Sequence, residues 1–252
     1  MNINNLKKIR LDILEMTYRA GEGHIPSAFS VAELLYILYS KMQKDDIFFL
    51  SKGHASAALY VVLAHFGHLD KKELNTFCQY GSKLGGHPHC IIKPIMNSSG
   101  SLGHGFPMAA GYALSKKIKK EPGRVFCLMG DGETNEGTTW ETAMYAEQLN
   151  LSNLVCIVDN NNSQTRAMTS VNLREKFKSF GWLSNEIDGH NFVEIASVLF
   201  DRKANNSTKP LSIIANTIKG KGIKEMENNH FAWHYRAPTE SEFKLFKKEL
   251  LQ

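Results

Sequence analysis

Cysteine is scarce in this sequence, and the few cysteines present are not arranged as pairs. Only four of the 252 residues are cysteine and none form a C-x-x-C motif, so neither a zinc site nor a thiol redox motif is indicated. Cys127 and Cys156 fall inside apolar runs, where cysteine behaves as a small buried hydrophobe. Such usage is typical of a reducing compartment, and we expect a cytoplasmic protein.

Long hydrophobic runs are also lacking, and none approaches the length that spans a bilayer. The N-terminus is not a signal peptide, because Leu6, Ile9, Ile13 and Met16 recur at helical spacing with charges between them, which predicts an amphipathic helix. The net charge is +5, but the densest basic run, residues 116–120, is best explained as the solvated C-terminal end of a helix. No nucleic-acid motif accompanies it, so we expect neither a membrane nor a nucleic acid as partner.

The remaining sequence alternates strand-like and helical segments. Short apolar runs at residues 125–129, 154–158 and 211–215 predict buried parallel strands. Helical patterns at residues 138–149 and 192–202 separate or follow them. This alternation predicts an α/β fold with a doubly wound, mostly parallel sheet and helices on both faces.

Two helix starts and one long loop complete the outline. Ser30-x-x-Glu33 has the form of a capping box, and Asp70-x-x-Glu73 is a similar start with an aspartate cap. Residues 79–102 are glycine-rich and weakly periodic. A loop of that length inside a compact domain is usually functional.

Polar residues follow two of the predicted strands, where α/β sheets bind their ligands. The first strand runs into Gly-Asp-Gly-Glu at residues 130–133 and the second into Asp-Asn-Asn-Asn-Ser at residues 159–163. Taken singly, each is well explained as an ordinary polar turn. Asn161 follows Asp131 by 30 positions, however, which is one strand–helix–strand unit, so both loops should open on one sheet edge. Their oxygens suit Mg²⁺, which takes about six such ligands, and the absence of a Walker A or G-x-G-x-x-G motif disfavours a nucleotide.

Histidine follows glycine at six of ten positions, where the backbone can bend sharply and carry an imidazole into a cleft. Imidazole is well matched to proton transfer near neutral pH. We interpret His68, His104 and His190 as turn residues. The other motifs, together with the two polar loops, resemble the transketolase family: Gly-His-Ile-Pro at 23–26, Ser-Lys-Gly-His-Ala at 51–55, Gly-Gly-His-Pro at 85–88, Gly-Ser-Leu-Gly-His-Gly at 100–105 and Trp-His-Tyr-Arg-Ala-Pro at 233–238.

The resemblance keeps the family's order from about residue 6 to residue 238, with three departures. An isoleucine separates His24 from its proline, His104 stands where the family has glutamine, and the loop at residues 160–164 is more polar than usual. These departures bear on substrate preference and ring packing more than on cofactor binding. The first loop is also similar to two-subunit transketolases of specialised sugar pathways, such as the apulose-4-phosphate enzyme.

The resemblance implies a role for each matched residue. Asp131 and Asn161 would bind Mg²⁺ through side chains and Ser163 through its carbonyl, with Ca²⁺ or Mn²⁺ as substitutes. His24 and His234 would handle the proton of the ketose C3 hydroxyl, and His54 and His87 would hydrogen-bond the C1 hydroxyl and C2 oxygen. Glu136 and Glu141 would lie near a subunit interface, although carboxylates at a helix N-terminus explain Glu141 equally well. The cofactor-binding residues implied are His54, Gly100, Leu102, Gly103, Gly132, Glu133, Asn161 and His234.

By the same resemblance the chain is a transferase that uses thiamine diphosphate to move a two-carbon ketol unit from a ketose, expected to be a sugar phosphate, to an aldose. We expect one diphosphate-binding domain over residues 1–252, ending in a helical tail from about residue 239. The family's glutamate that makes the cofactor reactive has no counterpart here. A second subunit carrying the pyrimidine-binding domain should bring it, in an α₂β₂ assembly.

Two alternatives remain open. Other two-subunit thiamine-diphosphate enzymes, such as acyloin synthases or the α chain of 2-oxoacid dehydrogenases, resemble the metal loops but not the Lys-Gly-His-Ala and Trp-His motifs. A non-catalytic module on the same fold is a different class of function, since fold does not determine function. The four motif histidines count against it.

Overall fold

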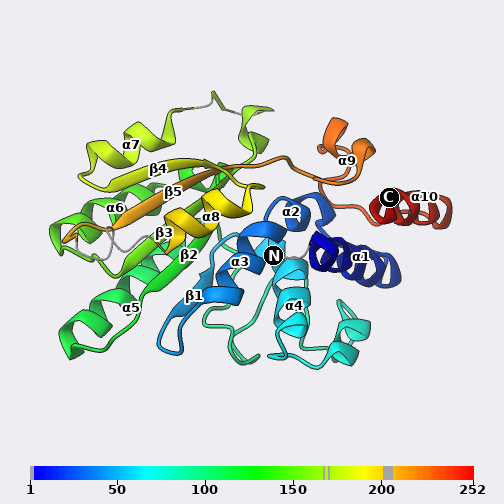
Figure 1. Cartoon of the computed structure of the whole chain (residues 1–252), viewed down its shortest axis with the longest axis horizontal. Coiled ribbons are helices and arrows are strands. Elements are labelled where there is room, and N and C mark those ends of the chain that lie inside the picture. The colour runs from blue at the N-terminus through cyan, green and yellow to red at the C-terminus, as the bar shows by residue number, and fades with distance from the viewer. Residues whose placement is uncertain (1–2, 167, 170, 201–206) are drawn as a thin grey trace.

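Five parallel strands form one sheet in the order β1-β2-β3-β5-β4 (Figure 1). The computed structural model describes residues 3–166, 168–169, 171–200 and 207–252. The α/β fold class is confirmed, as are the three predicted strands, each one or two residues longer than expected. The strands are β1 (Ile47–Leu50), β2 (Val125–Gly130), β3 (Leu154–Asn160), β4 (Leu183–Asp188) and β5 (Leu211–Asn216).

Helices cover both faces of this sheet and extend beyond one end of it (Figure 1). The α-helices are α1 (Ile3–Ala20), α2 (Ile25–Phe29), α3 (Ala32–Lys41), α4 (Ser56–His65), α5 (Gly105–Lys119), α6 (Gly137–Gln148), α7 (Leu173–Ser179), α8 (Phe192–Leu199), α9 (Lys224–Asn228) and α10 (Glu240–Leu251). Short 3₁₀ turns are η1 (Gly53–Ala55), η2 (Lys71–Thr76), η3 (Gly132–Asn135) and η4 (Ser163–Arg166).

Alternate residues of each central strand enter different cores, as the pleat requires. Leu128 and Ile157 point to the core shared with α1 to α4 and α8. Cys127 and Cys156 point to the core shared with α5, α6 and α7, which confirms that both thiols are buried. The central strands are therefore apolar over most of their length, and polar residues of β3 and β5 lie mainly at their carboxyl ends.

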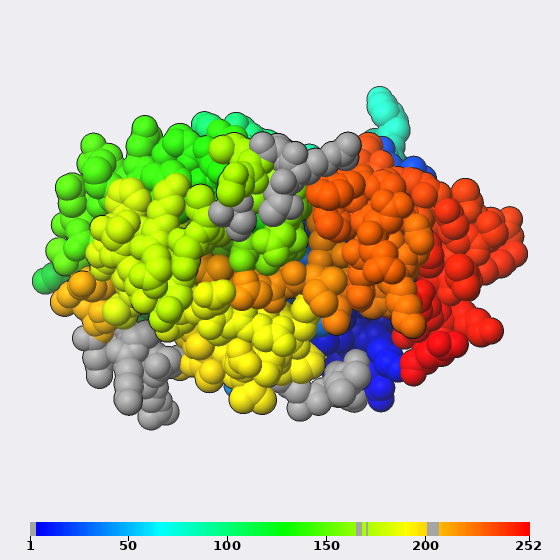
Figure 2. Space-filling model, turned by 90° about the horizontal axis from the view of Figure 1, so that it is seen from above, coloured from blue at the N-terminus to red at the C-terminus, as the bar shows by residue number. Residues whose placement is uncertain are grey.

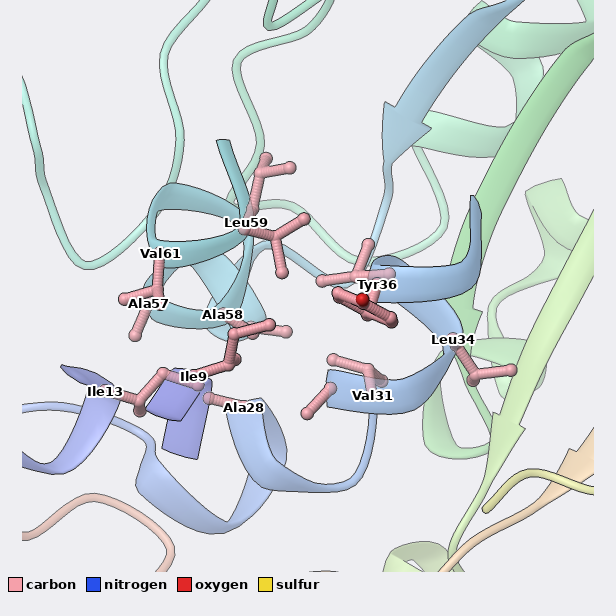
Figure 3. Packing of buried hydrophobic residues seen from close by; sticks show 14 of the residues in the cluster. Ile9, Ile13, Ala28, Val31, Leu34, Tyr36, Ala57, Ala58, Leu59 and Val61 are labelled. Atoms are coloured by element: carbon pink, nitrogen blue, oxygen red, sulfur yellow. The ribbon is translucent and has the colours of Figure 1, made fainter. Parts of the chain in front are cut away.

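The first core is built mainly between helices (Figure 3). Ile9 and Ile13 of α1 lie close to Ala57 and Ala58 of α4, and Tyr36 of α3 packs into the same cluster. Burying each large aliphatic side chain contributes ~1.5–3 kcal/mol, so this cluster holds the N-terminal helices against the sheet. The amphipathic stripe predicted for the first helix is confirmed, since Leu6, Ile9, Ile13 and Met16 are all buried.

The C-terminal helix returns to the N-terminal one. The rings of Tyr18 on α1 and Phe243 on α10 stack with centroids 4.2 Å apart, and Lys247 pairs with Glu15 at 2.7 Å. Figure 2 shows the orange and red C-terminal segments gathered at one end of the molecule, against the blue N-terminal helix. The segment before α10 thereby reaches the N-terminus of α2, where the ring centroids of His234 and His24 lie 5.4 Å apart. Among the described residues, no helix is long and apolar enough to span a membrane.

The predicted capping box at Ser30 is wrong. Helix α3 begins at Ala32 and its N-cap, Val31, makes no side-chain cap bond. The Ser30 hydroxyl instead lies 2.7 Å from Asp159 Oδ2 and 3.1 Å from the Ser27 carbonyl oxygen, while Glu33 pairs with Arg10. Buried tertiary partners thus outcompete the local cap.

Three other expectations need adjustment. Asp70 does cap a turn, accepting from the Lys72 amide at 2.9 Å, but the turn is 3₁₀ rather than α-helical. Lys116, expected to be solvated, is buried and donates to the Asp45 carbonyl at 2.9 Å. The helix predicted over residues 192–202 is confirmed to Leu199, and its last two residues lie outside the described part.

The predicted functional loop is confirmed to lack helix and strand from residue 77 to residue 104. It is nevertheless fixed to the sheet. The Asn97 side chain accepts from the Leu50 amide at 3.2 Å and donates to the Leu50 carbonyl at 3.1 Å, as a neighbouring strand would. Tyr60 of α4 donates to the Gly85 carbonyl at 3.1 Å. These bonds hold the loop against the carboxyl end of β1 and against α4.

Candidate active site

The loops after β2 and β3 meet at one edge of the sheet. Gly130 is in register with Asp159, and the Asp131 amide donates to the Asp159 carbonyl at 3.1 Å. The Ser163 hydroxyl donates to Asp131 Oδ1 at 3.1 Å, and its amide donates to Asn161 Oδ1 at 3.1 Å. The structure therefore brings together the three residues expected to bind a metal.

Asp131 carries an unpartnered buried oxygen. Only 1% of the residue is exposed, and its Oδ2 has no hydrogen-bond partner in the described part of the chain. Burial and the nearby Asp159 carboxylate raise the pKa of Asp131. A desolvated carboxylate oxygen with no donor is placed to meet a cation. Asn161 Nδ2 donates to Asp159 Oδ2 at 2.9 Å, which makes Asn161 Oδ1 the acceptor, and this oxygen receives the Ser163 amide.

A metal bound by Asp131 would need further ligands that are neither acidic side chains nor imidazoles. Across the described ranges, no three His, Cys, Asp or Glu side chains come close enough to hold an ion. An ion between Asp131 and Asn161 would therefore complete its shell with amide and carbonyl oxygens and with oxygens of a bound ligand. That donor set is the one hard divalent cations prefer.

These loops form one wall of a cavity of about 160 Å³. Four more segments close it, including the Ser-Lys-Gly-His turn after β1 and the turns after β5 and α9. The lining residues are Lys52, His54, Leu102, Gly130, Asp131, Gly132, Glu133, Asn161, Ser163, Gln164, Lys219 and His234.

Two buried lysines line this cavity. Lys52 stands in the Ser-Lys-Gly-His-Ala motif but was not predicted to be a site residue, and no motif pointed to Lys219. Lys52 forms an ion pair with Asp159, and each side chain is at most 1% exposed. Lys219 is 4% exposed with its Nζ 3.3 Å from His234 Nδ1, and burial together with Lys52 lowers its pKa to about 8. One signal could have revealed Lys219, since it follows the third predicted strand, at the edge where the other ligand loops lie. The wall is suited to an anion.

Gln164 is a further residue that the sequence did not point out. Its Oε1 accepts from Asn135 Nδ2 at 2.9 Å, which fixes the orientation of the amide. Its Nε2 is then a donor, is buried, and has no partner among the described residues. A buried donor without an acceptor costs ~1–3 kcal/mol, so a ligand acceptor is expected to face it.

Four histidines cluster beside the cavity. The ring centroid of His24 lies 5.6 Å from that of His54, 6.2 Å from that of His87 and 5.4 Å from that of His234. They come from the N-cap of α2, from η1, from the long loop and from the segment before α10. The four histidines singled out by sequence motif are thus neighbours in space.

Burial keeps three of these imidazoles neutral. It lowers the pKa of His24 to about 4, with His234 and His87 adding to the effect. Burial and the Lys52 ammonium hold the pKa of His54 well below its ordinary value, and burial lowers that of His234 too. Near neutral pH these rings can therefore accept protons and hydrogen bonds.

Glu133, expected to contact a cofactor, instead uses both carboxylate oxygens in hydrogen bonds within the protein. Its Oε1 accepts from the Gly103 amide at 2.9 Å and from the Ser51 hydroxyl, and its Oε2 accepts from the Gly130 amide at 3.2 Å. This buried carboxylate joins three of the loops around the cavity. Gly103 has φ 78°, and a Cβ there would lie 2.6 Å from Glu136 Cβ, so only glycine fits.

The other expected residues lie further out. Leu102 borders the cavity with 39% of its surface exposed, whereas Gly100 is exposed outside it with φ 157°. Glu136 is the exposed N-cap of α6, and Glu141 lines a separate apolar groove between α5 and α6. The structure does not bring these two glutamates into the cavity.

Comparison with known proteins places this geometry in a family. Residues 2–250 match the family model described as transketolase, thiamine diphosphate binding domain. The chain is 34% identical to an apulose-4-phosphate transketolase subunit of Phocaeicola vulgatus, over 97% of this chain and 92% of the relative. It is 35% identical to 6-deoxy-6-sulfo-D-fructose transketolase subunit SqwG of Clostridium sp., over 96% and 93% respectively.

A solved structure agrees. The transketolase of Campylobacter jejuni superposes with a TM-score of 0.89 at 30% identity, covering 99% of this chain and 43% of that one. The chain therefore spans less than half of that transketolase chain, but nearly all of the Phocaeicola and Clostridium subunits.

Proposed function

The chain belongs to the transketolase family, and we propose that it is the cofactor-binding subunit of a two-subunit transketolase. In this proposal it takes part in moving a two-carbon ketol unit from a ketose phosphate to an aldose. The relatives that it covers almost completely are themselves named as subunits of transketolases. Its four cysteines are free, which fits the cytoplasmic location that is part of the proposal.

One observation carries the proposal. The unpartnered Asp131 Oδ2 and the Asn161 amide line the same small cavity, and four imidazoles lie at its side. The side-chain oxygens suit a divalent cation bound to a diphosphate. The imidazoles suit proton transfer and hydrogen bonding to a sugar. No other described part of the chain combines the two.

The cavity fits thiamine diphosphate with Mg²⁺. Asp131 and Asn161 would give side-chain oxygens to the ion and Ser163 its carbonyl, with Ca²⁺ or Mn²⁺ able to substitute. Lys219 and the Gln164 Nε2 donor would face diphosphate oxygens. A Cβ built at Gly132 would have only Gln164 Cβ nearby, at 3.9 Å, so a phosphate can approach this backbone.

The histidines would act on the sugar. When bound, thiamine diphosphate supplies the carbanion chemistry that breaks the C2–C3 bond of a ketose. His24 and His234, neutral at pH 7, would take the proton of the C3 hydroxyl. His54 and His87 would hydrogen-bond the C1 hydroxyl and the C2 oxygen. Positioned proton transfer of this kind contributes ~10²–10⁴-fold to a rate.

A partner subunit completes the site in this proposal. It would carry the pyrimidine-binding domain and the glutamate that activates the cofactor, in an α₂β₂ assembly. Apolar side chains around the histidine cluster remain exposed, with Tyr235 at 55% and Phe231 at 38%. Surfaces of this kind mark sites of protein–protein contact.

A second contact would lie on α5 and α6. There an apolar groove of about 300 Å³ contains Glu141, and Tyr145 and Leu149 are 59% and 41% exposed. We propose that this face, with Glu136 at its margin, joins the two copies of the assembly. Sedimentation of Tyr145→Glu in the complete assembly should give half the native mass, and an unchanged mass would contradict this contact.

Reconstitution tests the proposed function. The chain is co-expressed with a transketolase subunit that carries the pyrimidine-binding domain and is assayed for ketol transfer from ketose phosphates, with thiamine diphosphate and Mg²⁺. Turnover should need both subunits and both ligands, and Asp131→Ala should abolish it. Full activity of this chain alone, or of Asp131→Ala in the assembly, would reject the proposal.

A further inference from the structure

The turn that carries Lys219 is held from behind by a buried ionic cluster. β5 ends at Asn216, and residues 217–223 then turn so that the Lys219 side chain enters the cavity. The cluster lies on the opposite side of this turn and consists of Arg10 on α1, Glu33 on α3 and His190 in the turn after β4. None of the three lines the cavity.

Arg10 connects the cluster to one end of the turn. Its Nη2 lies 2.7 and 2.8 Å from the two Glu33 oxygens, and these side chains are 9% and 6% exposed. Its Nε donates to the Lys221 carbonyl at 2.9 Å. Burial opposes ionisation of Glu33, but His190 and Arg10 hold its pKa below the ordinary value, so the pair is charged.

His190 connects the cluster to the other end. Its Nε2 accepts from the Ile218 amide at 2.8 Å. A ring nitrogen that accepts a hydrogen bond carries no proton, so the proton of the neutral ring is on Nδ1. Nδ1 lies 3.2 Å from Glu33 Oε2, outside strict hydrogen-bond geometry, and has no other partner in the ranges described. The two contacts together assign one tautomer.

The two anchored backbone groups flank the lysine. The Ile218 amide precedes Lys219 directly, and the Lys221 carbonyl follows it by two residues. Between them Gly220 takes φ 86° and its amide donates to the Pro26 carbonyl at 3.0 Å. These bonds fix the backbone on both sides of Lys219, and its ammonium is placed further by the 3.3 Å contact with His234 Nδ1.

We propose that Arg10, Glu33 and His190 form a clamp on residues 218–221 that positions Lys219 in the anion-binding cavity, with His190 held as the neutral Nδ1–H tautomer. The clamp itself follows from contacts within the chain. Only its effect on diphosphate affinity rests on the proposed function. All three are positioning residues, because none reaches the cavity.

The tautomer can be read without any ligand. Nitrogen-15 spectra of the full-length free chain, labelled at histidine, distinguish a protonated ring nitrogen from an unprotonated one. His190 should show a protonated Nδ1 and a bare Nε2 at pH 7.5. A protonated Nε2 at His190 would overturn the assignment, because such a ring cannot accept from the Ile218 amide.

Two isosteric variants separate the two contacts of the ring. In His190→Gln the side-chain oxygen can occupy the place of Nε2 and accept from the Ile218 amide. In His190→Asn the amide nitrogen can occupy the place of Nδ1 and donate to Glu33, but nothing accepts from Ile218. A purely structural role would make the two variants equally disturbed.

Hydrogen exchange of the free chain gives the first readout. The Ile218 amide should exchange about tenfold faster in His190→Asn and near the native rate in His190→Gln, because one hydrogen bond is lost only in the first. In the reconstituted enzyme the KM for thiamine diphosphate should rise about tenfold in His190→Asn alone, with the KM for the ketose unchanged.

The outcomes are separable. Equal exchange in both variants overturns the clamp. Different exchange with identical cofactor KM values overturns the link between the clamp and Lys219. A native assembly without turnover would reject the proposed function, while the spectra and exchange rates of the free chain would still decide whether the clamp exists.

Discussion

Replacing Asp131 by asparagine should change the stability of this protein in opposite directions without and with its ligands. The substitution keeps the shape of the side chain and the Oδ1 bonds from Gly132 and Ser163. It removes a buried charge whose second oxygen has no partner and whose pKa is raised by burial and by Asp159. In the free chain the substitution removes the free-energy cost of burying an unpaired charge. In the assembly it removes the main anionic ligand of the proposed metal.

The size of each change can be estimated. An unpaired buried charge costs more than an unpaired buried amide, so Asp131→Asn should stabilise the free chain by about 1–2 kcal/mol. For a chain of this size that is a rise of about 2–6 °C in Tm. In the reconstituted assembly, ligand at one hundred times its Kd should add ~2.7 kcal/mol to the native protein. The variant should gain less than about 0.5 kcal/mol under the same conditions.

Asp46→Asn is the matched control. Asp46 is also buried, but both of its oxygens are used, by the Arg124 amide at 2.8 Å and the Gln43 amide at 2.9 Å. An asparagine there can keep only one of these bonds, so it should destabilise the free chain by ~1 kcal/mol and leave the ligand gain intact. Urea unfolding and scanning calorimetry measure both quantities.

Two results would refute this reasoning. The first is that Asp131→Asn destabilises the free chain as Asp46→Asn does, which would mean that other groups of the chain stabilise the Asp131 carboxylate. Alternatively, the assembly of Asp131→Asn would keep the native gain from thiamine diphosphate and Mg²⁺. That result would remove Asp131 from the metal site.

His54→Ala should retain the ligand-induced rise in Tm but lower kcat by ~10²–10⁴-fold. Native turnover would show that His54 does not hydrogen-bond the reacting sugar. Glu133→Gln should cost ~1–3 kcal/mol in urea unfolding, because Gly103, Gly130 and Ser51 all donate to that buried carboxylate; a loss within error would show that it does not join the loops. The pKa of His24 falls from 6.5 to about 4 on folding, so between these two pH values the unfolded chain binds a proton that the folded chain does not. The contribution of His24 to the free energy of unfolding is therefore fully present above pH 6.5 and declines as the pH falls toward 4. His24→Asn should flatten that decline by ~1 kcal/mol in pH-dependent unfolding, allowing for solvent screening of a half-buried ring, and an identical pH profile would contradict it.

Much of the fold could be predicted because the central strands are buried on both faces. Their continuous apolar runs at residues 125–129, 154–158 and 211–215 need no tertiary information. β4 was missed because it is an edge strand with few apolar residues: Asn185 and Glu186 are exposed, and one of its two buried positions is Ser184. β1 is only four residues long and offers too short a pattern. Ser30 was misassigned because its partner, Asp159, is far away in the sequence.

The residues of the site could also be predicted only in part. Asp131 and Asn161 could be paired because the carboxyl ends of neighbouring parallel strands meet at one edge, which spacing alone can express. Lys52 and Lys219 could not be identified as buried cations, since a lysine beside a glycine is usually solvent-exposed. Gln164 became informative only when its Oε1 was found bonded to Asn135, leaving a buried donor without an acceptor. Burial and orientation are properties of the folded chain.

The proposed function depends on the loops after β2 and β3 binding one cation and a diphosphate together. Mn²⁺ accepts the same oxygen ligands as Mg²⁺ and scatters anomalously, so crystals of the assembly grown with Mn²⁺ and thiamine diphosphate would locate a bound ion directly. We predict one anomalous peak within coordination distance of both Asp131 Oδ2 and Asn161 Oδ1. A peak at any other side chain, or diphosphate density without a metal between these two residues, would contradict it.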